Sequence, residues 1–171
     1  MITPSQTVGP FFGFALPYAE GHHVVPPWHP GAVLLQGRVL DGAGEPVPDA
    51  IVEIRQADAD GRAPSAVGAL RRAGHGFSGF GRSATDAAGG YWFTTVKPGG
   101  DNPYIALLVF ARGLLKPVAT RVYFPEDAGA DPLLRGLEPE RRETLIAARD
   151  ERGYRFDVRL QGERETVFLA F

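Results

Sequence analysis

Residues 34–57, LLQGRVLDGAGEPVPDAIVEIRQA, contain two apolar runs separated by a dense turn signal. The first run is Leu34 to Leu40, and the second is Ile51 to Ala57, in which apolar and charged residues alternate. Alternation with a period of two is typical of a strand that buries one face. Between the runs, the glycines and proline of Asp41 to Pro46 favour a reversal of the chain. The stretch therefore predicts a strand, a tight reversal and a second strand.

Similar short runs continue along the rest of the chain. Further strands are expected at Tyr91 to Val96, Ile105 to Ala111, Val118 to Phe124, Tyr154 to Leu160 and Glu165 to Phe171. One short helix is expected near 139–149, because Pro139 suits a first helical turn and Glu140 suits the positive end of the helix dipole. Long loops are expected over Ala15 to Gly31 and Asp58 to Gly81. The pattern predicts an all-β fold, an antiparallel two-sheet β-sandwich.

The composition agrees with one β-rich domain. The chain has 171 residues, 44% of them apolar, with 22 Gly and 15 Pro, which disfavours a helical bundle or a coiled coil. A chain of this length buries enough surface for a single core. We expect residues 1–32 to form an arm and loop that pack on the core or on a partner. Residues 33–171 are expected to form the single sandwich domain.

Charge and cysteine usage exclude several classes of protein. The formal net charge is −2, so nucleic acid is not expected as the main partner. No cysteine is present, which excludes disulfides, thiolate zinc sites and cysteine nucleophiles. The sequence shows neither a signal peptide nor an apolar run of membrane-spanning length. We therefore expect a cytoplasmic protein without membrane contact.

The N-terminal arm is unusually aromatic. Between Thr7 and Tyr18, the segment carries Phe11, Phe12 and Phe14 close together. Such a patch is unfavourable in water, so it is expected to cover either its own sandwich or another chain.

Eight segments in order resemble one enzyme family. They are Thr3 to Pro10, Leu35 to Gly42, Glu53 to Gly61, Phe80 to Thr85, Thr95 to Gly99, Phe110 to Gly113, Arg141 to Ala147 and Tyr154 to Asp157. Together they resemble the alpha subunits of the intradiol ring-cleaving dioxygenases. The resemblance implies an oxidoreductase of aromatic catabolism with a β-sandwich core. It further implies a hetero-oligomer of alpha and beta subunits that cleaves 3,4-dihydroxybenzoate with O₂ to 3-carboxy-cis,cis-muconate in the β-ketoadipate pathway.

The resemblance also implies non-haem ferric iron, which the family holds with two Tyr phenolates and two His imidazoles. The positions that match these ligands carry Ala63, Tyr104 and Ala106, and the loop after Pro98-Gly99 lacks a tyrosine. We therefore expect no metal ligand and no catalytic residue on this chain. The Fe(III) of the assembled enzyme would be held by the beta subunit, and this chain would be inactive alone.

The resemblance implies that the alpha subunit completes the substrate pocket at the interface with the beta subunit. The matching positions for substrate binding are Thr7, Gly9, Pro10, Phe11 and Arg112. An arginine at position 112 could attract the carboxylate of the aromatic substrate.

Two other functions stay open on the sequence. The first is a non-enzymatic, transthyretin-like binding module, because residues 37–52 fit any strand–turn–strand unit. The second is a self-sufficient, homo-oligomeric intradiol enzyme, which would need ligands that the sequence does not provide.

Overall fold

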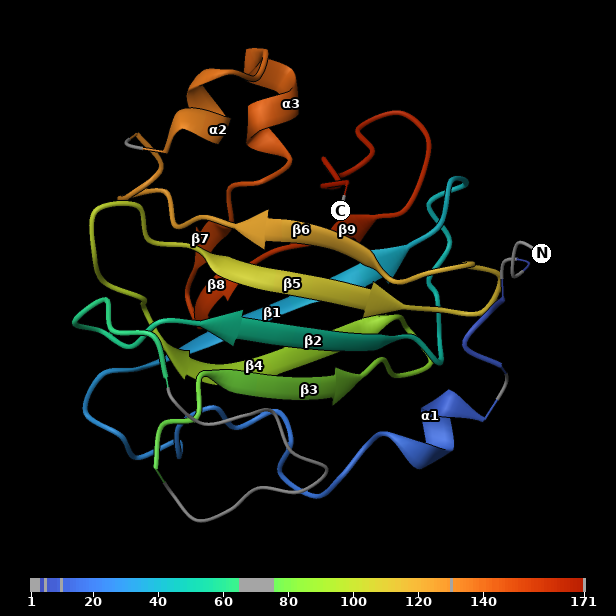
Figure 1. Cartoon of the computed structure of the whole chain (residues 1–171), viewed down its shortest axis with the longest axis horizontal. Helices are drawn as coiled ribbons and strands as arrows, with labels where there is room; N and C mark the ends of the chain where they lie inside the picture. The colour runs from blue at the N-terminus through green and yellow to red at the C-terminus, as the bar shows by residue number, and fades with distance from the viewer. Residues whose placement is uncertain (1–3, 5, 10, 65–75, 130, 171) are drawn as a thin grey trace.

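The computed structural model of the chain describes residues 4, 6–9, 11–64, 76–129 and 131–170. Within these residues the strands form two sheets that face each other, with the main apolar core between them (Figure 1). One sheet has the order β4-β1-β8-β7, with β9 also paired to β1, and the other has the order β3-β2-β5-β6. The strands are β1 (Ala32–Leu40), β2 (Ile51–Gln56), β3 (Phe80–Ala84), β4 (Gly90–Val96), β5 (Ile105–Phe110), β6 (Val118–Val122), β7 (Ala148–Asp150), β8 (Gly153–Arg155) and β9 (Val158–Arg159). The predicted β-sandwich is confirmed.

The side chains of β2 and β5 alternate between the core and the outer surface. Ile54 lies opposite Leu107 in the antiparallel register, and both are buried in the core. Arg55 lies opposite Ala106, one position further along, so both belong to the other face of the sheet. The outer face of the β3-β2-β5-β6 sheet therefore points away from the core of the sandwich.

Strand β1 has both antiparallel and parallel neighbours, whereas the prediction was of a purely antiparallel sandwich. It runs antiparallel to β4 but parallel to β8 and β9. Gly37 lies where the parallel partner changes from β8 to β9. Here the amide of Phe156 donates to the carbonyl of Gln36 at 2.8 Å, and the Tyr91 hydroxyl donates to the carbonyl of Phe156 at 2.5 Å. A Cβ at Gly37 would overlap that same carbonyl oxygen.

The helix predicted near 139–149 is shorter than expected. The described residues contain the helices α1 (Phe12–Ala15), α2 (Pro132–Arg135) and α3 (Pro139–Glu143). Helix α3 begins at Pro139, but the chain beyond it bonds to the end of β6 instead. The Tyr123 amide donates to the Leu145 carbonyl, and the Ala147 amide donates to the Tyr123 carbonyl, both at 2.9 Å. This pairing ends the helix and leads into β7.

The last predicted strand, Glu165 to Phe171, is wrong over the described residues 165–170. This segment contributes one isolated bridge, between Leu169 and Ala119. Thr166 is held differently, because its hydroxyl accepts a hydrogen bond from the Arg159 amide at 3.0 Å. The Thr166 amide also donates to the Arg159 carbonyl at 3.0 Å, so the two residues are joined at one point and not by a continuous ladder.

The loop predicted over Asp58 to Gly81 ends earlier, because β3 begins at Phe80. The sequence of β3, FGRSA, lacks apolar alternation, and its strand conformation depends on pairing with β2. Residues 65–75 lie outside the described part of the chain, and His75 is among them.

The irregular segment predicted over Ala15 to Gly31 covers an edge of the first sheet. The Thr94 amide donates to the His22 carbonyl at 3.0 Å, and the Val24 amide donates to the Thr94 carbonyl at 2.9 Å. Val24 and Val25 are buried beneath this contact. The segment therefore protects the backbone of β4 from pairing with another chain.

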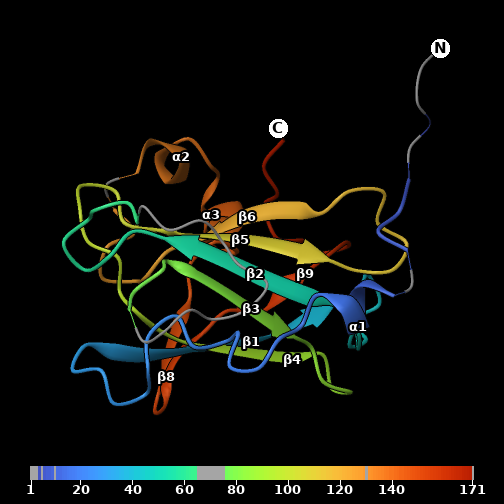
Figure 2. The same cartoon turned by 60° about the horizontal axis from the view of Figure 1, so that its bottom comes forward.

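Residues 6–9, which precede α1 in the chain, lead away from the sandwich (Figure 2). None of the helices within the described ranges has the length and apolar character that crossing a bilayer requires.

Replacing Gly37 with alanine tests the packing of the parallel strands. The new methyl group would displace the Phe156 carbonyl, so Gly37→Ala should lower the free energy of unfolding by about 2 kcal/mol or more. Urea denaturation measures this change. The control is Gly129→Ala, because a Cβ there meets nothing within 4 Å. Equal unfolding free energies for the two variants would contradict the proposed contact.

Candidate functional site

A cavity of about 560 Å³ with mixed polar and apolar walls opens where β2 ends and β5 begins. Ala63, Tyr104 and Ala106 all line it, although Ala63 is far from the other two in the sequence. These are the three positions that the family resemblance assigns to iron ligands. The structure therefore brings them together at one site. The other lining residues are Arg55, Gln56, Ala57, Gly61, Pro64, Pro98, Gly99, Gly100, Asp101, Asn102 and Pro103.

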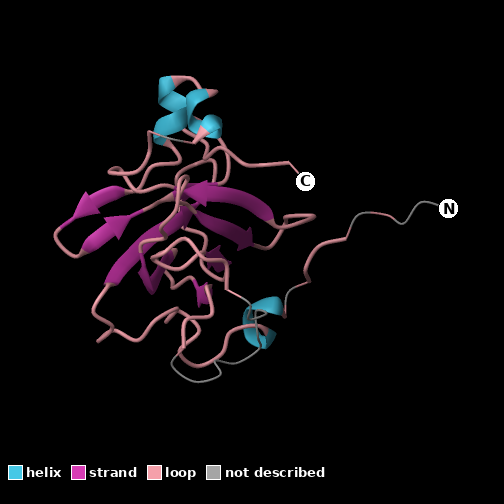
Figure 3. Ribbon diagram, turned by 60° about the vertical axis from the view of Figure 1, so that its left-hand side comes forward, coloured by secondary structure: helices cyan, strands magenta, loops and turns pink. Residues whose placement is uncertain are grey.

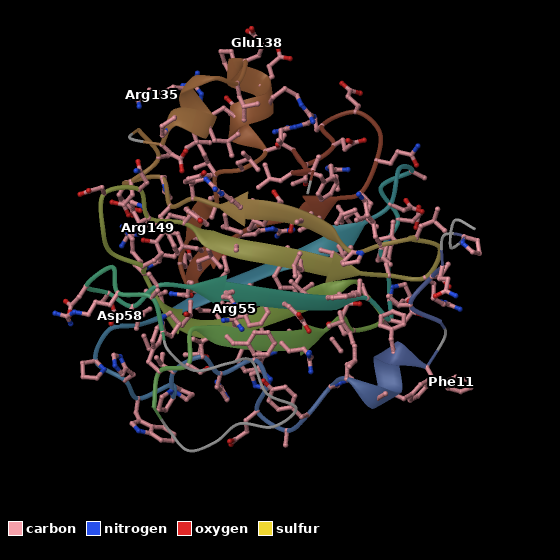
Figure 4. All side chains as sticks on the ribbon, viewed as in Figure 1. Phe11, Arg55, Asp58, Arg135, Glu138 and Arg149 are labelled. Atoms are coloured by element: carbon pink, nitrogen blue, oxygen red, sulfur yellow. The ribbon has the colours of Figure 1, made fainter. Side chains whose placement is uncertain are left out.

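The walls of this cavity are two segments fastened to each other through Asp58. Its side chain accepts hydrogen bonds from the amides of Asp60 at 3.0 Å and Arg62 at 2.8 Å. Its carbonyl accepts a third bond from the Gly99 amide at 2.9 Å. A Cβ at Gly61 would lie 2.9 Å from the Gly100 backbone, so only glycine permits this approach. Asp58 and Arg55 mark this end of β2 in Figure 4.

The residues at this cavity do not fit a ferric ion. Fe³⁺ is a hard cation that needs several anionic or imidazole ligands around it. Methyl groups stand at Ala63 and Ala106, and no cluster of three or more His, Cys, Asp or Glu that could hold a metal occurs in the described ranges. Among the three positions that match family ligands, only Tyr104 retains a side chain of a suitable type.

Tyr104 is engaged with a cation instead. The guanidinium carbon of Arg121 lies 4.0 Å from the centre of the Tyr104 ring. Arg121 also bonds to Asp131, with an Nη1–Oδ2 distance of 3.1 Å, and to the Tyr123 hydroxyl at 3.2 Å. Burial raises the pKa of Tyr123 to about 12, so this second phenol stays protonated at neutral pH. A fixed positive charge beside Tyr104 opposes the binding of a metal cation.

The predicted substrate residues of the N-terminal arm lie away from this cavity. The Gly9 amide donates to the Thr7 hydroxyl at 3.3 Å, and Gly9 has a φ of +76°. Phe11 is 74% exposed and Phe14 is 85% exposed. Pro10 lies outside the described residues. Figure 3 shows the backbone of residues 6–9 projecting from the body of the molecule.

Arg82 fastens the base of this arm to the outer face of the β3-β2-β5-β6 sheet. Its Nη1 donates to the Leu16 carbonyl at 2.8 Å, and its Nε donates to Glu53 at 2.7 Å. The guanidinium also lies 5.6 Å from the centre of the Tyr18 ring. The Arg82 and Glu53 side chains are only 10% and 13% exposed. This cluster sets the point at which the arm leaves the sheet.

Arg112, the other predicted substrate residue, lies at the end of β5 opposite the cavity. Its Nε bonds to Asp49 at 2.5 Å, and the side chain is 67% exposed. Helix α1 reaches the same place, because a Cβ at Gly13 would lie 3.8 Å from the Asp49 carbonyl. These contacts group Arg112 with the base of the arm. In Figure 1, α1 lies toward the end of β5, away from the start of β5 where the cavity opens.

Sequence reasoning missed three residues that shape these sites: Asp58, Arg82 and Arg121. A local signal existed for Asp58, because the sequence Asp58-Ala-Asp-Gly61 is typical of a turn. No local signal existed for Arg82 and Arg121, because their roles arise from residues on neighbouring strands.

Comparison with known proteins gives consistent matches. The family model described as Dioxygenase matches residues 23–104. The chain is 40% identical to the protocatechuate 3,4-dioxygenase alpha chain of Burkholderia cepacia, covering 98% of this chain and 96% of that relative. It is 43% identical to the alpha chain of the Pseudomonas putida enzyme, covering 99% of this chain and 96% of the relative.

A beta chain and a solved structure are also similar. The chain is 34% identical to the protocatechuate 3,4-dioxygenase beta chain of Burkholderia cepacia, covering 78% of this chain and 66% of that one. The dioxygenase domain of a dioxygenase–carbohydrate-binding fusion from Streptomyces sp. SirexAA-E superposes with a TM-score of 0.58 at 25% identity, covering 94% of this chain and 99% of that domain.

Removing the charge of Arg82 should release the base of the arm. Arg82→Gln leaves Glu53 without its cation and should lower the free energy of unfolding by about 3 kcal/mol. Hydrogen exchange should increase most over residues 11–21. The control is Arg62→Gln, because the Arg62–Asp60 pair is exposed and should contribute less than about 1 kcal/mol. Unchanged exchange at the arm in Arg82→Gln would refute its anchoring role.

Proposed function

The chain belongs to the intradiol dioxygenase family, and on that premise we propose that it is the alpha subunit of a protocatechuate 3,4-dioxygenase. With a beta subunit as its partner, it would cleave 3,4-dihydroxybenzoate with O₂ to 3-carboxy-cis,cis-muconate. The observation that carries this proposal is the 40–43% identity to two alpha chains over nearly the whole chain. The match to a beta chain is weaker and covers less of the chain.

We propose that the ferric ion of this enzyme is held by the beta subunit, and that this chain is catalytically inactive alone. The support comes from the cavity at the start of β5, where Ala63 and Ala106 offer no ligand and Arg121 places a positive charge beside Tyr104. Bound to the partner, the iron would supply the activation of the aromatic diol toward oxygen.

The contribution proposed for this chain is to complete the substrate pocket from the arm side. Thr7, Gly9, Pro10 and Phe11 are the arm residues assigned to it, with Arg112 nearby. The support is structural, because the arm projects into solvent and Arg112 lies at the same end of the sheet as its base. A projecting aromatic segment is suited to contact a second chain.

The experiment is expression of the chain with and without a beta-type chain that carries the full tyrosine and histidine ligand set. Iron is measured by elemental analysis, the tyrosinate-to-iron band by visible absorption, and activity by 3,4-dihydroxybenzoate-dependent oxygen uptake. We expect iron, colour and activity only in the complex. Stoichiometric iron in the lone chain would overturn the proposal and favour a self-sufficient enzyme.

The proposed role of Arg112 gives a separate prediction. Arg112→Ala removes a guanidinium that could attract the substrate carboxylate, or pair with the partner, without touching the iron ligands. In the co-purified complex, we expect KM to rise about tenfold or the complex to dissociate more easily, with the iron content unchanged. The control is Arg135→Ala, the exposed arginine at the end of α2. Wild-type kinetics and assembly for Arg112→Ala would argue against this role.

A further inference from the structure

Residues 20–25 form a strap that joins the edges of the two sheets. Strand β4 ends the first sheet and β3 ends the second, so these two edges meet along one side of the sandwich. The Arg82 amide of β3 donates to the Gly21 carbonyl of the strap at 2.7 Å. The Thr94 amide of β4 donates to the His22 carbonyl at 3.0 Å. The strap therefore closes the seam between β3 and β4.

The inner side of the strap completes the core at this seam. Val24 and Val25 are at most 1% exposed, and their amides donate to the Thr94 carbonyl at 2.9 and 3.2 Å. Val24 also packs tightly on β3, because a Cβ at Gly81 would lie 2.8 Å from its Cγ2 atom. Opening the strap would therefore expose both core side chains and the backbone of β4.

The outer side of the strap carries two imidazole rings that pack on Trp92 of β4. The ring centres of His22 and Trp92 are 3.9 Å apart, and those of His23 and Trp92 are 5.3 Å apart. The two imidazoles are themselves 4.2 Å apart. In addition, His23 Nδ1 lies 3.2 Å from the Thr94 hydroxyl. Two groups that titrate near neutral pH therefore stand at the contact between the strap and β4.

The closed strap contains one unfavourable backbone conformation. Glu20 has a φ of +59°, in the left-handed region that residues other than glycine rarely adopt. The turn is held by the His23 amide, which donates to the Glu20 carbonyl at 3.0 Å. Opening the strap releases this strain, so the closed form depends on the contacts of the valines and the imidazoles.

From this arrangement we propose that the strap is an acid-sensitive switch, closed while both imidazoles are neutral and opened at the seam between β3 and β4 when they gain protons. Two positive charges 4.2 Å apart repel each other. A protonated imidazole also regains its hydration when it leaves the surface of Trp92. A cation on an indole ring is favourable by itself, and the proposal requires that repulsion and lost hydration exceed this gain.

The charges on the strap give the direction of the pH dependence. Burial lowers the pKa of His22, and the neighbouring His23 lowers it further, whereas Glu20 raises it. His22 therefore binds fewer protons in the closed strap than in the open chain. Its contribution to the closed form is complete above pH 6.5, the ordinary value, and is lost as the pH falls through the lower pKa of the closed strap.

The neighbouring strands also place charged groups around this contact. On β3, Arg82 is paired with Glu53. Beside Trp92, a hollow on the outer face of the first sheet is lined by Arg38 of β1 and by Asp86 from the turn before β4. Because none of these groups is a histidine, histidine variants separate the effect of the strap from that of the surrounding charges.

This switch goes beyond the proposed function, because it involves neither iron nor a partner chain. Hydrogen exchange of the full chain between about pH 7.5 and about pH 5 tests it, with rates expressed as protection factors. We expect the protection of the Thr94 amide to fall severalfold more than that of Leu107, which lies in an interior strand of the second sheet. Equal losses at both amides, or an NMR titration that places the pKa of His22 above 6.5, would overturn the proposal.

Matched variants assign the effect to the strap. His22→Phe keeps a ring on Trp92 without a titratable group, so it should remove most of the pH dependence at the Thr94 amide. The control is His29→Gln, because His29 is an exposed histidine just beyond the strap, and this variant should behave as the wild type. Circular dichroism checks that each variant is folded. If His22→Phe does not fold, His22→Gln decides alone, and wild-type pH dependence in a folded variant of His22 would refute the switch.

Discussion

The close passage of Phe156 over Gly37 is the contact on which the arrangement of the first sheet depends. At this point β1 exchanges one parallel neighbour for another, and the carbonyl of Phe156 is close enough to β1 to exclude any Cβ. The Tyr91 hydroxyl bonds to the same carbonyl from β4. Phe156, in the short segment between β8 and β9, is therefore bonded to β1 through its amide and to β4 through its carbonyl. Strand β1 retains neighbours on both of its edges along most of its length.

Strand β1 is central to the first sheet, and the cavity and the charged residues described above lie on the second sheet, β3-β2-β5-β6. Its inner face completes the core, while its outer face presents arginines from three of its four strands. The cavity lies at one end of this sheet, and Arg112 and the base of the arm lie at the other. Strand register positions the arginines of this face, Arg55, Arg82 and Arg121. Loop segments build the cavity walls, and Arg112 follows the end of β5.

The fold could be predicted further from the sequence than the sites could. The hairpin in residues 34–57 is recognisable because its periodicity and turn residues are local. The failures came from tertiary pairing: β3 is a strand because β2 is beside it, and the helix from Pro139 ends because Tyr123 captures the following backbone. The C-terminal sequence from Val167 is a continuous apolar run, yet Thr166 and Leu169 bond at separate points instead of forming a ladder. For the cavity, the family resemblance identified Ala63, Tyr104 and Ala106. The role of Arg121 stayed hidden, because only the fold brings it against Tyr104 and Asp131.

The exposure of Phe11 and Phe14 has a consequence for how the chain is produced. Two aromatic rings held at the surface by a short helix favour self-association whenever nothing else covers them. The concentration of protein that remains free of aggregates would then depend on how much of the surface that covers these rings is available. Synthesis in excess of that supply would end in aggregates or in proteolysis rather than in a reserve of free subunits.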